Sequence, residues 1–439
     1  MLEREEKLYV QRNPKSQALS LKASQSWLCG VPMHWMVDWG LPFPLFVEEA
    51  QGATLRDSDG HELADFCLGD TGAMFGHSPK AIADCLTKEG SRGLTTMLPS
   101  PDAAIVGALL EDRFGLPFWQ ATATASDANR AVIRWARAIT GRSKILIFNH
   151  AYHGCVDETF VTADHGHIKM VEGVVGEPRD LTHFTKVIEF NDVAALEAAL
   201  KDQDVACVLA EPVMTNVGMV LPHHGFLETL RTLTNKTNTL LIFDETHTLT
   251  SSPGGYAKSV GIKPDGLVFG KPIAGGIPAA LYGFSGEVAE RIQNYLAKRG
   301  QGRSGIGTTL SGSRIQLALI RCVLEEFMTD AVFEASIILA QRLERGVADV
   351  IIKHSLPWHV TRVGARVEFI CSEKPPDNGF EASQAIHRPI DEAVHRFLLN
   401  RGVVITPFHN MMLICPATTQ AQIEHLMNNL EACVAELLN

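Results

Sequence analysis

The stretch LIFDETHTLT, residues 241–250, places reactive side chains directly after a short apolar run. The apolar run ends at Asp244 and Glu245, and His247 follows two residues later. Two carboxylates and an imidazole can bind a metal ion, act as an acid–base pair, or hold a charged cofactor in place. The surrounding sequence has to decide between these three kinds of site.

A lysine closes the next apolar stretch, GLVFGKPIAGG, residues 266–276. A charged amine at the end of an apolar strand is costly unless it is paired or used. The glycine pair Gly275-Gly276 that follows Lys271 lets the backbone approach another group closely. A partly desolvated lysine can form a Schiff base and later carry a proton. A solvent-exposed lysine just beyond the strand is the simpler alternative.

Asp244 precedes Lys271 by 27 residues, about the length of one strand–helix–strand unit. A buried carboxylate there needs a cationic or hydrogen-bonding partner, and a protonated pyridine nitrogen is one such partner. The alternative, of equal weight, is that Asp244 caps the next helix.

Three further stretches offer groups that can bind a phosphate or an aromatic ring. Residues 122–130, TATASDANR, precede an amphipathic helix, and the first N–H groups of this helix can bind a phosphate. Equally, Ser126 or Asp127 can simply cap the helix. In HAYHG, residues 150–154, Tyr152 can stack on a planar ring with His153 beside it. The hydroxyls of GIGTTLSGS, residues 305–313, can also reach a phosphate.

The elements that would position these residues alternate between strands and helices from about residue 100. Strands are predicted at Lys144–Phe148, Ala206–Ala210, Leu240–Phe243, Gly266–Phe269 and Ala280–Phe284, and helices include Ala128–Thr140 and Phe226–Thr234. This alternation predicts a mostly parallel α/β sheet with helices on both faces. Ligands bind beyond the carboxyl ends of such strands, which is where Asp244 falls.

The two ends of the chain follow other patterns. Residues 1–28 are predicted to be helical, 29–46 irregular, and two short strands surround the DSDG turn at 57–60. A long helical segment, 313–349, precedes strands near 366–371 and 402–415 and a closing helix at 419–437. We therefore predict an N-terminal segment, 1–55, that packs with the small domain, a large domain, 56–312, and a small α+β domain, 313–439.

The composition is that of a globular protein and disfavours several partners. The chain has 439 residues, 46% hydrophobic and 20% charged, with a net charge of −11 that disfavours nucleic acid and anionic membranes. No apolar run is long enough to span a membrane, and the charged N-terminus lacks the apolar core of a signal peptide. The nine cysteines are scattered without a CxxC pair, which favours reduced thiols in the cytoplasm and predicts no metal site.

The order of three motifs resembles a known family. LAEPV (209–213), LIFDE (241–245) and GKPIAGGIP (270–278) resemble the class III pyridoxal 5′-phosphate (PLP) aminotransferases of fold-type I. The resemblance covers residues 28–430 and is greatest to the branch that includes glutamate-1-semialdehyde 2,1-aminomutase. It implies a large PLP-binding domain with a mostly parallel seven-stranded sheet, a smaller α+β C-terminal domain, an N-terminal segment, and a homodimer with its active site at the subunit interface.

The resemblance also implies roles for individual residues. Lys271 forms the Schiff base with PLP, and Asp244 holds the pyridinium proton; these two are the predicted catalytic residues. The other predicted cofactor-binding residues are Thr124, Ala125 and Ser126 at the phosphate, Tyr152 on the ring face, Glu211 and Asn216 near the ring edge, Thr246 and His247 after the D-E pair, and Thr308 or Thr309 reaching the phosphate from the neighbouring subunit.

The chain departs from the family pattern at several of these positions. Ala125 replaces the glycine of the family's phosphate cradle, which leaves the backbone donors in place. Thr246 replaces a valine that packs on the ring, and His247 stands where an uncharged residue is usual. We expect His247 to support the site by a hydrogen bond rather than to act as the catalyst.

The departures that bear on the substrate lie elsewhere. The arginine that binds a carboxylate in the aminomutase branch aligns with Met36, and its gating glutamate aligns with Asn410. Both changes argue against glutamate-1-semialdehyde as the substrate. The predicted substrate contacts are Trp35, Met36, His153 and Asn410. A pocket that also includes Met33, His34, Trp39, Phe408 and Met411 would suit an apolar or aromatic amine, although these residues can equally serve to pack the N-terminal segment.

The resemblance therefore predicts an aminotransferase that moves an amino group between an amino acid or amine and a keto acid. An aminomutase of the glutamate-1-semialdehyde type, a racemase or a lyase on the same scaffold is the alternative, because these enzymes share Lys271 and Asp244. A nucleotide-binding α/β enzyme is disfavoured, because the sequence has no GxGxxG or GxxxxGK[ST] loop.

Overall fold

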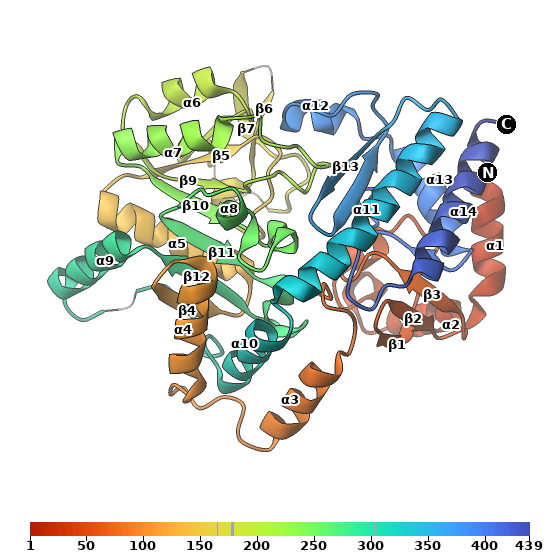
Figure 1. The fold of residues 1–439 in the computed structure, drawn as a ribbon, viewed down its shortest axis with the longest axis horizontal. Helices are drawn as coiled ribbons and strands as arrows, with labels where there is room; N and C mark the ends of the chain where they lie inside the picture. Colours follow the sequence, from red (N-terminus) through yellow and green to blue (C-terminus); the bar gives the residue numbers. More distant parts are fainter. Residues whose placement is uncertain (165, 177–179, 303) are drawn as a thin grey trace. The chain divides into compact units, whose positions relative to one another are not determined.

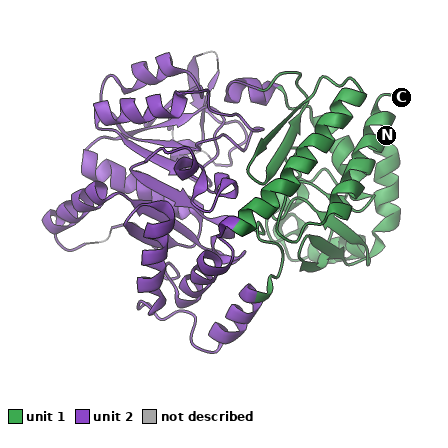
Figure 2. Cartoon of the chain, viewed as in Figure 1, with its two compact units in different colours: residues 1–80, 331–375, 385–439 green, residues 81–330, 376–384 purple. Residues whose placement is uncertain are grey.

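The computed structural model describes residues 1–164, 166–176, 180–302 and 304–439. They form two compact units, shown in different colours in Figure 2. Unit 1 comprises Met1–Lys80, Ala331–Pro375 and Ala385–Asn439, and unit 2 comprises Ala81–Asp330 and Pro376–Gln384. The domain borders at 55/56 and 312/313 stay a prediction. In unit 1, β3 (Glu62–Asp65) pairs in parallel with β15 (Val403–Val404), which ties residues beyond 55 to the C-terminal part of the chain.

The seven-stranded sheet of unit 2 confirms the predicted α/β fold (Figure 1). Only β12 runs antiparallel to its neighbours, β11 and β4. In spatial order the strands are β4 (Phe118–Thr122), β12 (Ala280–Phe284), β11 (Gly266–Phe269), β10 (Leu240–Asp244), β9 (Val205–Ala210), β5 (Lys144–Phe148) and β8 (Thr185–Ile188).

Helices cover the central strands of this sheet on both faces, since every residue of β9, β10 and β11 is buried. The amphipathic helix α5 (Ala125–Thr140) contacts β9, β11 and β12 and contributes Val132, Trp135 and Ala136 to the core. Figure 1 shows α6 (Val193–Leu200) beside α7 (Phe226–Thr237), and α7 contacts β10.

The other elements of unit 2 are short or lie beside the sheet. They are α3 (Lys80–Gly90, whose first residue belongs to unit 1), α4 (Asp102–Phe114), α8 (Gly255–Ser259), α9 (Gly286–Arg299), α10 (Arg314–Glu326), α12 (Gly379–Gln384), the hairpin β6 (Val161–Asp164) and β7 (His167–Met170), and the 3-10 turns η3 (Asp157–Thr159), η4 (Thr248–Ser251) and η5 (Lys271–Ala274).

Unit 1 contains two small sheets and the helices of both chain ends. One sheet has the order β1-β2-β3-β15 and the other the order β13-β14-β16. Its remaining elements are α1 (Leu2–Arg12), α2 (Pro14–Ala23), η1 (Leu28–Gly30), η2 (His34–Val37), β1 (Val47–Gln51), β2 (Thr54–Asp57), α11 (Asp330–Lys353), β13 (His359–Val363), β14 (Arg366–Ile370), α13 (Arg388–Leu399), β16 (Met411–Leu413) and α14 (Gln420–Leu437). Within this unit α1 packs on α13, and the Asn400 amide donates to the Glu5 carboxylate at 2.9 Å.

Two predicted helical segments are each divided in the structure. The segment 1–28 breaks at Asn13, because Pro14 has no N–H and is suited to the first turn of a new helix. The segment 313–349 breaks after α10, and α11 begins at Asp330, preceded by Thr329; both residue types favour helix starts.

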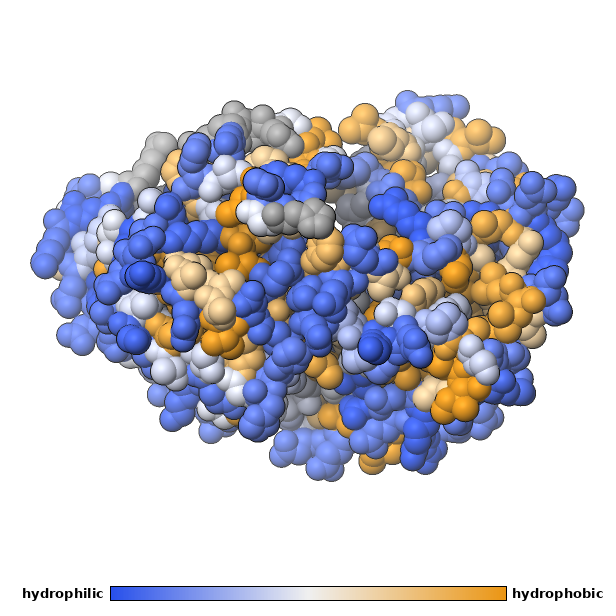
Figure 3. Space-filling view, turned by 90° about the horizontal axis from the view of Figure 1, so that it is seen from above, coloured by the Kyte–Doolittle hydropathy of each residue, from blue (hydrophilic) through white to orange (hydrophobic). Residues whose placement is uncertain are grey.

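The surface in Figure 3 is mainly hydrophilic, with hydrophobic residues in small groups. In the described part of the chain, no helix combines the length and the apolar character needed to cross a membrane.

Candidate active site

Asp244 and Lys271 follow neighbouring strands at the same edge of the sheet. Strands β10 and β11 are parallel, and Asp244 is opposite Val268 in their register. Strand β11 ends at Phe269, so Lys271 lies two residues beyond it, as the first residue of η5. The parallel alignment therefore brings together the two residues that the sequence predicts to be catalytic.

Lys271 has a backbone conformation that is rare for a residue with a side chain. Its φ is +48°, in the left-handed region, and Gly275 and Gly276 also have positive φ. Such a conformation costs about 1–3 kcal/mol in a non-glycine residue and concentrates at functional sites. The chain thus holds Lys271 in a strained turn rather than in a relaxed strand end.

Asp244 is buried and accepts hydrogen bonds at both carboxylate oxygens. Asn129 Nδ2 lies 2.8 Å and His153 Nδ1 3.1 Å from Oδ2, while the Thr246 hydroxyl and N–H lie 2.6 and 3.1 Å from Oδ1. Burial favours a higher pKa for Asp244, but the hydrogen bonds from these three residues outweigh it, so the pKa is lowered. Asp244 is therefore ionised at neutral pH.

Three buried polar atoms near Asp244 lack a hydrogen-bond partner among the described residues. They are Oδ1 of Asn129, Nε2 of His153 and Oε1 of Glu211. The other oxygen of Glu211 accepts from Thr215 N at 3.1 Å and lies 3.5 Å from Asn216 Nδ2. Burial raises the pKa of Glu211, which favours its protonated form. Unpaired buried groups of this kind are expected where a ligand binds.

The N-terminus of α5 lies against the turn that carries Lys271. Thr124 caps this helix by accepting from Asp127 N at 3.2 Å, which leaves the N–H groups of Ala125 and Ser126 in its first turn. A Cβ on Gly270 would lie 3.2 Å from the Ala125 side chain. The geometry fits the predicted phosphate cradle, because N–H groups at a helix N-terminus favour an anion.

The loop that carries Tyr152 and His153 also packs on this helix terminus. Ser126 Oγ accepts from Cys155 N at 2.9 Å, and a Cβ on Gly154 would overlap that hydroxyl. Glycine is needed here both for space and for its φ of +78°. Tyr152 itself is 48% exposed, so its stacking on a cofactor ring stays a prediction.

His247 lies beside the predicted Schiff-base lysine. Its Nε2 is 2.9 Å from Nζ of Lys271, and the imidazole is buried. A supporting hydrogen bond from His247 was predicted from the sequence, but its partner, Lys271, was not.

Asn129 is a second feature that sequence analysis did not select. It is buried in α5, and its amide links Asp244 to the carbonyl of His153 at 3.0 Å. The sequence feature that could have indicated its role is an asparagine on the apolar face of a helix, in the stretch TATASDANR.

Glu245 has a structural position in the turn after β10. Its carboxylate accepts from the N–H groups of Tyr256 and Ala257 at the start of α8, and from the Thr248 hydroxyl. Burial raises the pKa of Glu245 to about 7, although these hydrogen bonds act in the opposite direction. Both acids of LIFDE are thus held in place by neighbouring residues.

Other predicted residues lie outside this cluster. Thr308 and Thr309 are on an exposed loop, where Thr308 N donates to Ser311 Oγ at 3.0 Å. Their contact with the phosphate of a neighbouring subunit stays a prediction.

Three of the predicted substrate contacts, Trp35, Met36 and Asn410, belong to unit 1. Asn410 bridges Asp391, at 2.8 Å, and His395, at 3.0 Å, and Trp35 forms an edge contact with Phe408. Their role toward a substrate stays a prediction.

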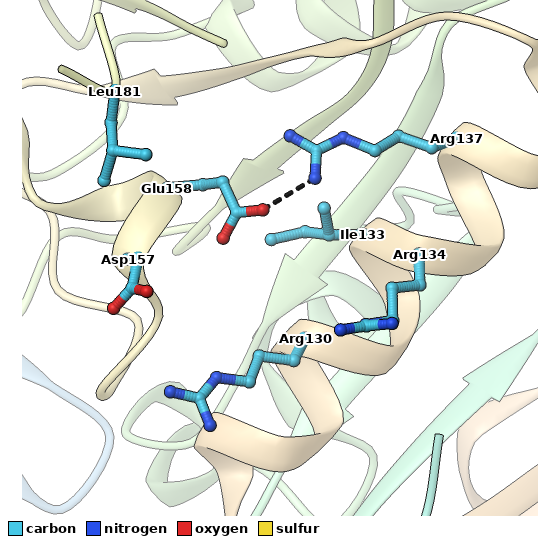
Figure 4. A pocket seen from close by; sticks show the side chains of 7 residues that line it. All are labelled: Arg130, Ile133, Arg134, Arg137, Asp157, Glu158 and Leu181. Carbon is cyan, nitrogen blue, oxygen red and sulfur yellow. Dashed lines mark hydrogen bonds and ion pairs between the residues drawn. The ribbon is translucent and has the colours of Figure 1, made fainter. Parts of the chain in front are cut away.

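A cavity of about 510 Å³ lies on the solvent side of α5 and is lined mainly by charged side chains (Figure 4). Its lining residues are Arg130, Ile133, Arg134, Arg137, Asp157, Glu158 and Leu181. Arg137 pairs with Glu158 at 2.6 Å. None of the predicted site residues lines this cavity.

Comparison with protein families gives a match over most of the chain. Residues 36–434 match the model of the family described as aminotransferase class-III. The chain belongs to this family. The resemblance predicted from LAEPV, LIFDE and GKPIAGGIP is therefore confirmed.

Members of the family with high similarity include aminomutases. A glutamate-1-semialdehyde 2,1-aminomutase of Akkermansia muciniphila is 30% identical over 401 residues, which cover 90% of this chain and 92% of the relative. The crystal structure of a glutamate-1-semialdehyde aminomutase from Pseudomonas aeruginosa PAO1 has a TM-score of 0.97 and 46% identity, covering 99% of this chain and 97% of that one. An omega-transaminase from Sphaerobacter thermophilus, at 24% identity and a TM-score of 0.89, shares the fold, with 98% and 100% coverage.

The predicted cofactor, PLP, agrees with the cofactor found in one of these relatives. A lysine-to-alanine variant of the Pseudomonas enzyme was solved in complex with PMP, the aminated form of PLP. The residues of this chain fit such a group, because the start of α5 offers N–H donors and His153 and Glu211 each present a buried polar atom without a partner in the described chain. Asp244 would hold the protonated ring nitrogen of the cofactor, because its carboxylate is ionised.

Proposed function

We propose that the chain is a PLP-dependent aminomutase, which moves an amino group between neighbouring carbon atoms of one small substrate. The observation that carries the PLP-dependent part of the proposal is the strained Lys271, which follows the strand next to that of the ionised Asp244 at the carboxyl edge of the sheet. The relatives that carry the aminomutase name support this function over the aminotransferase, which sequence analysis placed first.

The described residues can perform three tasks in this reaction. Asp244 can keep the ring nitrogen of PLP protonated, and the N–H groups at the start of α5 can hold its phosphate. When bound, PLP supplies an electron sink for the bonds at the amino-bearing carbon. The amine of Lys271, released when the substrate binds, can take a proton from one carbon and return it to another.

The remaining predicted contacts complete the proposed active site. Tyr152 would stack on the ring, Glu211 and Asn216 would lie at its edge, and Thr308 or Thr309 of a second copy would reach the phosphate. The last contact requires a homodimer, which we propose together with a cytoplasmic location. His153 would orient Asp244 through Nδ1.

An aminotransferase that acts on an apolar or aromatic amine is the second candidate. Two residues favour it: Met36 and Asn410 stand at the positions of the aminomutase branch's carboxylate-binding arginine and gating glutamate. Neither side chain can form an ion pair with an acidic substrate.

One experiment separates these candidates. The PLP-loaded protein is incubated with glutamate-1-semialdehyde alone, and separately with a panel of amines plus pyruvate or 2-oxoglutarate, and the products are separated by chromatography and identified by tandem mass spectrometry. An aminomutase converts the single substrate into an isomer of the same mass with a different retention time. Formation of a new amino acid only when a keto acid is supplied would replace the aminomutase by the aminotransferase. Absence of a borohydride-reducible PLP adduct on Lys271 would reject both.

A further inference from the structure

The contact between His247 and Lys271 has no counterpart in the motifs that identify the family. The two nitrogen atoms, Nε2 and Nζ, are 2.9 Å apart and come from different strand ends, 24 residues apart in the chain.

The backbone around His247 fixes the position of the imidazole. The preceding residue, Thr246, donates to Asp244, and the following residue, Thr248, donates to Glu245 at 3.1 Å. The carbonyl of His247 accepts from the N–H of Thr250 at 3.2 Å and from its hydroxyl at 2.9 Å. A buried side chain on a turn held at both sides loses little entropy when it forms a hydrogen bond.

The distance restricts the protons that this pair can carry. An ammonium has three N–H donors and no acceptor, and a doubly protonated imidazole is also only a donor. Two cations at 2.9 Å would place N–H against N–H, so one of the facing nitrogens must present a lone pair. A neutral imidazole offers such a lone pair at Nε2, and the ammonium supplies the donor.

The other titratable groups of the neighbouring strand ends are already engaged. Asp244 accepts from Asn129 and His153, Glu245 accepts from the start of α8, and Glu211 accepts from Thr215. Nε2 of His247 lies within hydrogen-bond distance of Nζ of Lys271.

We propose that His247 is a positioning residue for Lys271, whose Nε2 accepts a hydrogen bond from Nζ and holds the amine where it exchanges its proton. The inference rests on the proposed function, in which Lys271 carries PLP and then moves a proton. A lysine side chain has four rotatable bonds, and a misplaced amine makes proton transfer slower. The imidazole restrains Nζ without adding a second positive charge.

Two substitutions separate the hydrogen bond from the volume of the side chain. His247→Gln keeps an acceptor oxygen, whereas His247→Leu fills space without one. If His247→Leu does not fold, His247→Asn replaces it, because its amide is too short to reach Nζ. Each protein is prepared at full length, with and without PLP.

The first measurement is the rate of acylation of Lys271 by acetic anhydride at one fixed pH in protein freed of PLP, followed by peptide mass spectrometry. In His247→Leu, Lys271 is expected to be acylated about tenfold faster, because Nζ no longer donates to the imidazole and can meet the reagent. His247→Gln is expected to stay near the wild-type rate. An unchanged rate in His247→Leu, or equal changes in both variants, would overturn the inference.

The second measurement uses the PLP-loaded proteins and the substrate that the product assay identifies. For His247→Leu, kcat is expected to fall about tenfold with KM nearly unchanged, and His247→Gln is expected to recover most of the loss. A wild-type kcat in His247→Leu would contradict a positioning role. Borohydride labelling of wild-type Lys271 tests the proposed function separately. Labelled Lys271 with unchanged acylation rates in both variants rejects only the inference, and unlabelled Lys271 rejects the proposed function.

Discussion

Lys271 differs from an ordinary surface lysine in its backbone as well as in its side chain. Its φ is positive, Gly275 and Gly276 complete the turn, and its amine contacts His247. A solvent-exposed lysine after a strand would need none of these features. The strain is consistent with a residue whose position is fixed for a reaction rather than for stability.

Replacing Lys271 by Ala should separate cofactor binding from turnover. The variant should still bind PLP, because Asp244 and the start of α5 are unchanged, but without a borohydride-reducible adduct at position 271. Turnover should fall by about 10²–10⁴-fold, the usual contribution of a positioned proton carrier. Absorbance and peptide mass spectrometry measure the adduct, and the product assay measures turnover.

Lys236→Ala provides the control for this experiment, because Lys236 is an exposed lysine on α7. It should behave as wild type in both measurements. Near-normal turnover by Lys271→Ala would refute the role of Lys271 as the proton carrier.

The site residues at or just beyond a strand end could be predicted from the sequence. Asp244 and Lys271 follow apolar runs, so their position at the edge of the sheet could be predicted. Asn129 could not, because its partner Asp244 is 115 residues away and a polar residue within a helix more often has a local role. The contact of His247 with Lys271 was also missed, because the two residues are 24 positions apart in the chain.

At the scale of the elements, fully apolar strands were predicted more accurately than strands that mix apolar and polar residues. Strands β5, β11 and β12 have the predicted bounds, whereas β4 and β8 were not predicted. Strand β4, FWQAT, lies at the edge of the sheet with two of its five residues exposed and two more partly exposed, so its apolar signal is weak. The pairing of β3 with β15 joins distant segments and leaves no local signal in the sequence.

The junction between α5 and the loop at 150–155 gives a prediction for a pair of elements. Gly154→Ala would force a Cβ against Ser126 Oγ, in addition to the strain of a positive φ. We expect a stability loss of at least about 2 kcal/mol and PLP binding weakened by about tenfold, because the loop can no longer pack on the start of the helix.

Gly141→Ala is the matched control, since Gly141 ends the same helix at φ +70° with no atom near an added Cβ. It should lose only about 1 kcal/mol and bind PLP normally. Urea denaturation and PLP titration provide the measurements. Equal effects of the two substitutions on PLP binding would mean that the contact with Ser126 has no bearing on the cradle.

Asn410 joins two elements of unit 1 through a buried polar network. It lies between Asp391 on α13, whose pKa is raised by burial, and His395 on the same helix, whose pKa is lowered to about 4 by burial. Asn410→Ala leaves both partners without this hydrogen bond, so unfolding should require about 1–3 kcal/mol less. Asn428→Ala, an exposed position on α14, should change stability by less than about 0.5 kcal/mol in the same urea titration.

At the scale of the whole molecule, the proposed homodimer should cover apolar side chains that a single chain leaves exposed. Met97 and Leu98 are 79% and 72% exposed and adjacent in one loop of unit 2. Paired large apolar side chains on a surface mark an interface more often than single ones do. We therefore expect a copy of the chain to cover this loop.

Met97→Glu tests this expectation, because a carboxylate in a buried interface must lose its hydration. Light scattering should give the mass of a dimer for the wild type and a concentration-dependent shift toward the monomer for Met97→Glu. Ile352→Glu, at a residue of α11 that is 74% exposed, is the control and should remain dimeric. If Thr309 of one copy reaches the phosphate bound by the other, the monomeric fraction of Met97→Glu should also bind PLP more weakly. A wild-type monomer that binds PLP and turns over substrate would remove the need for a second copy.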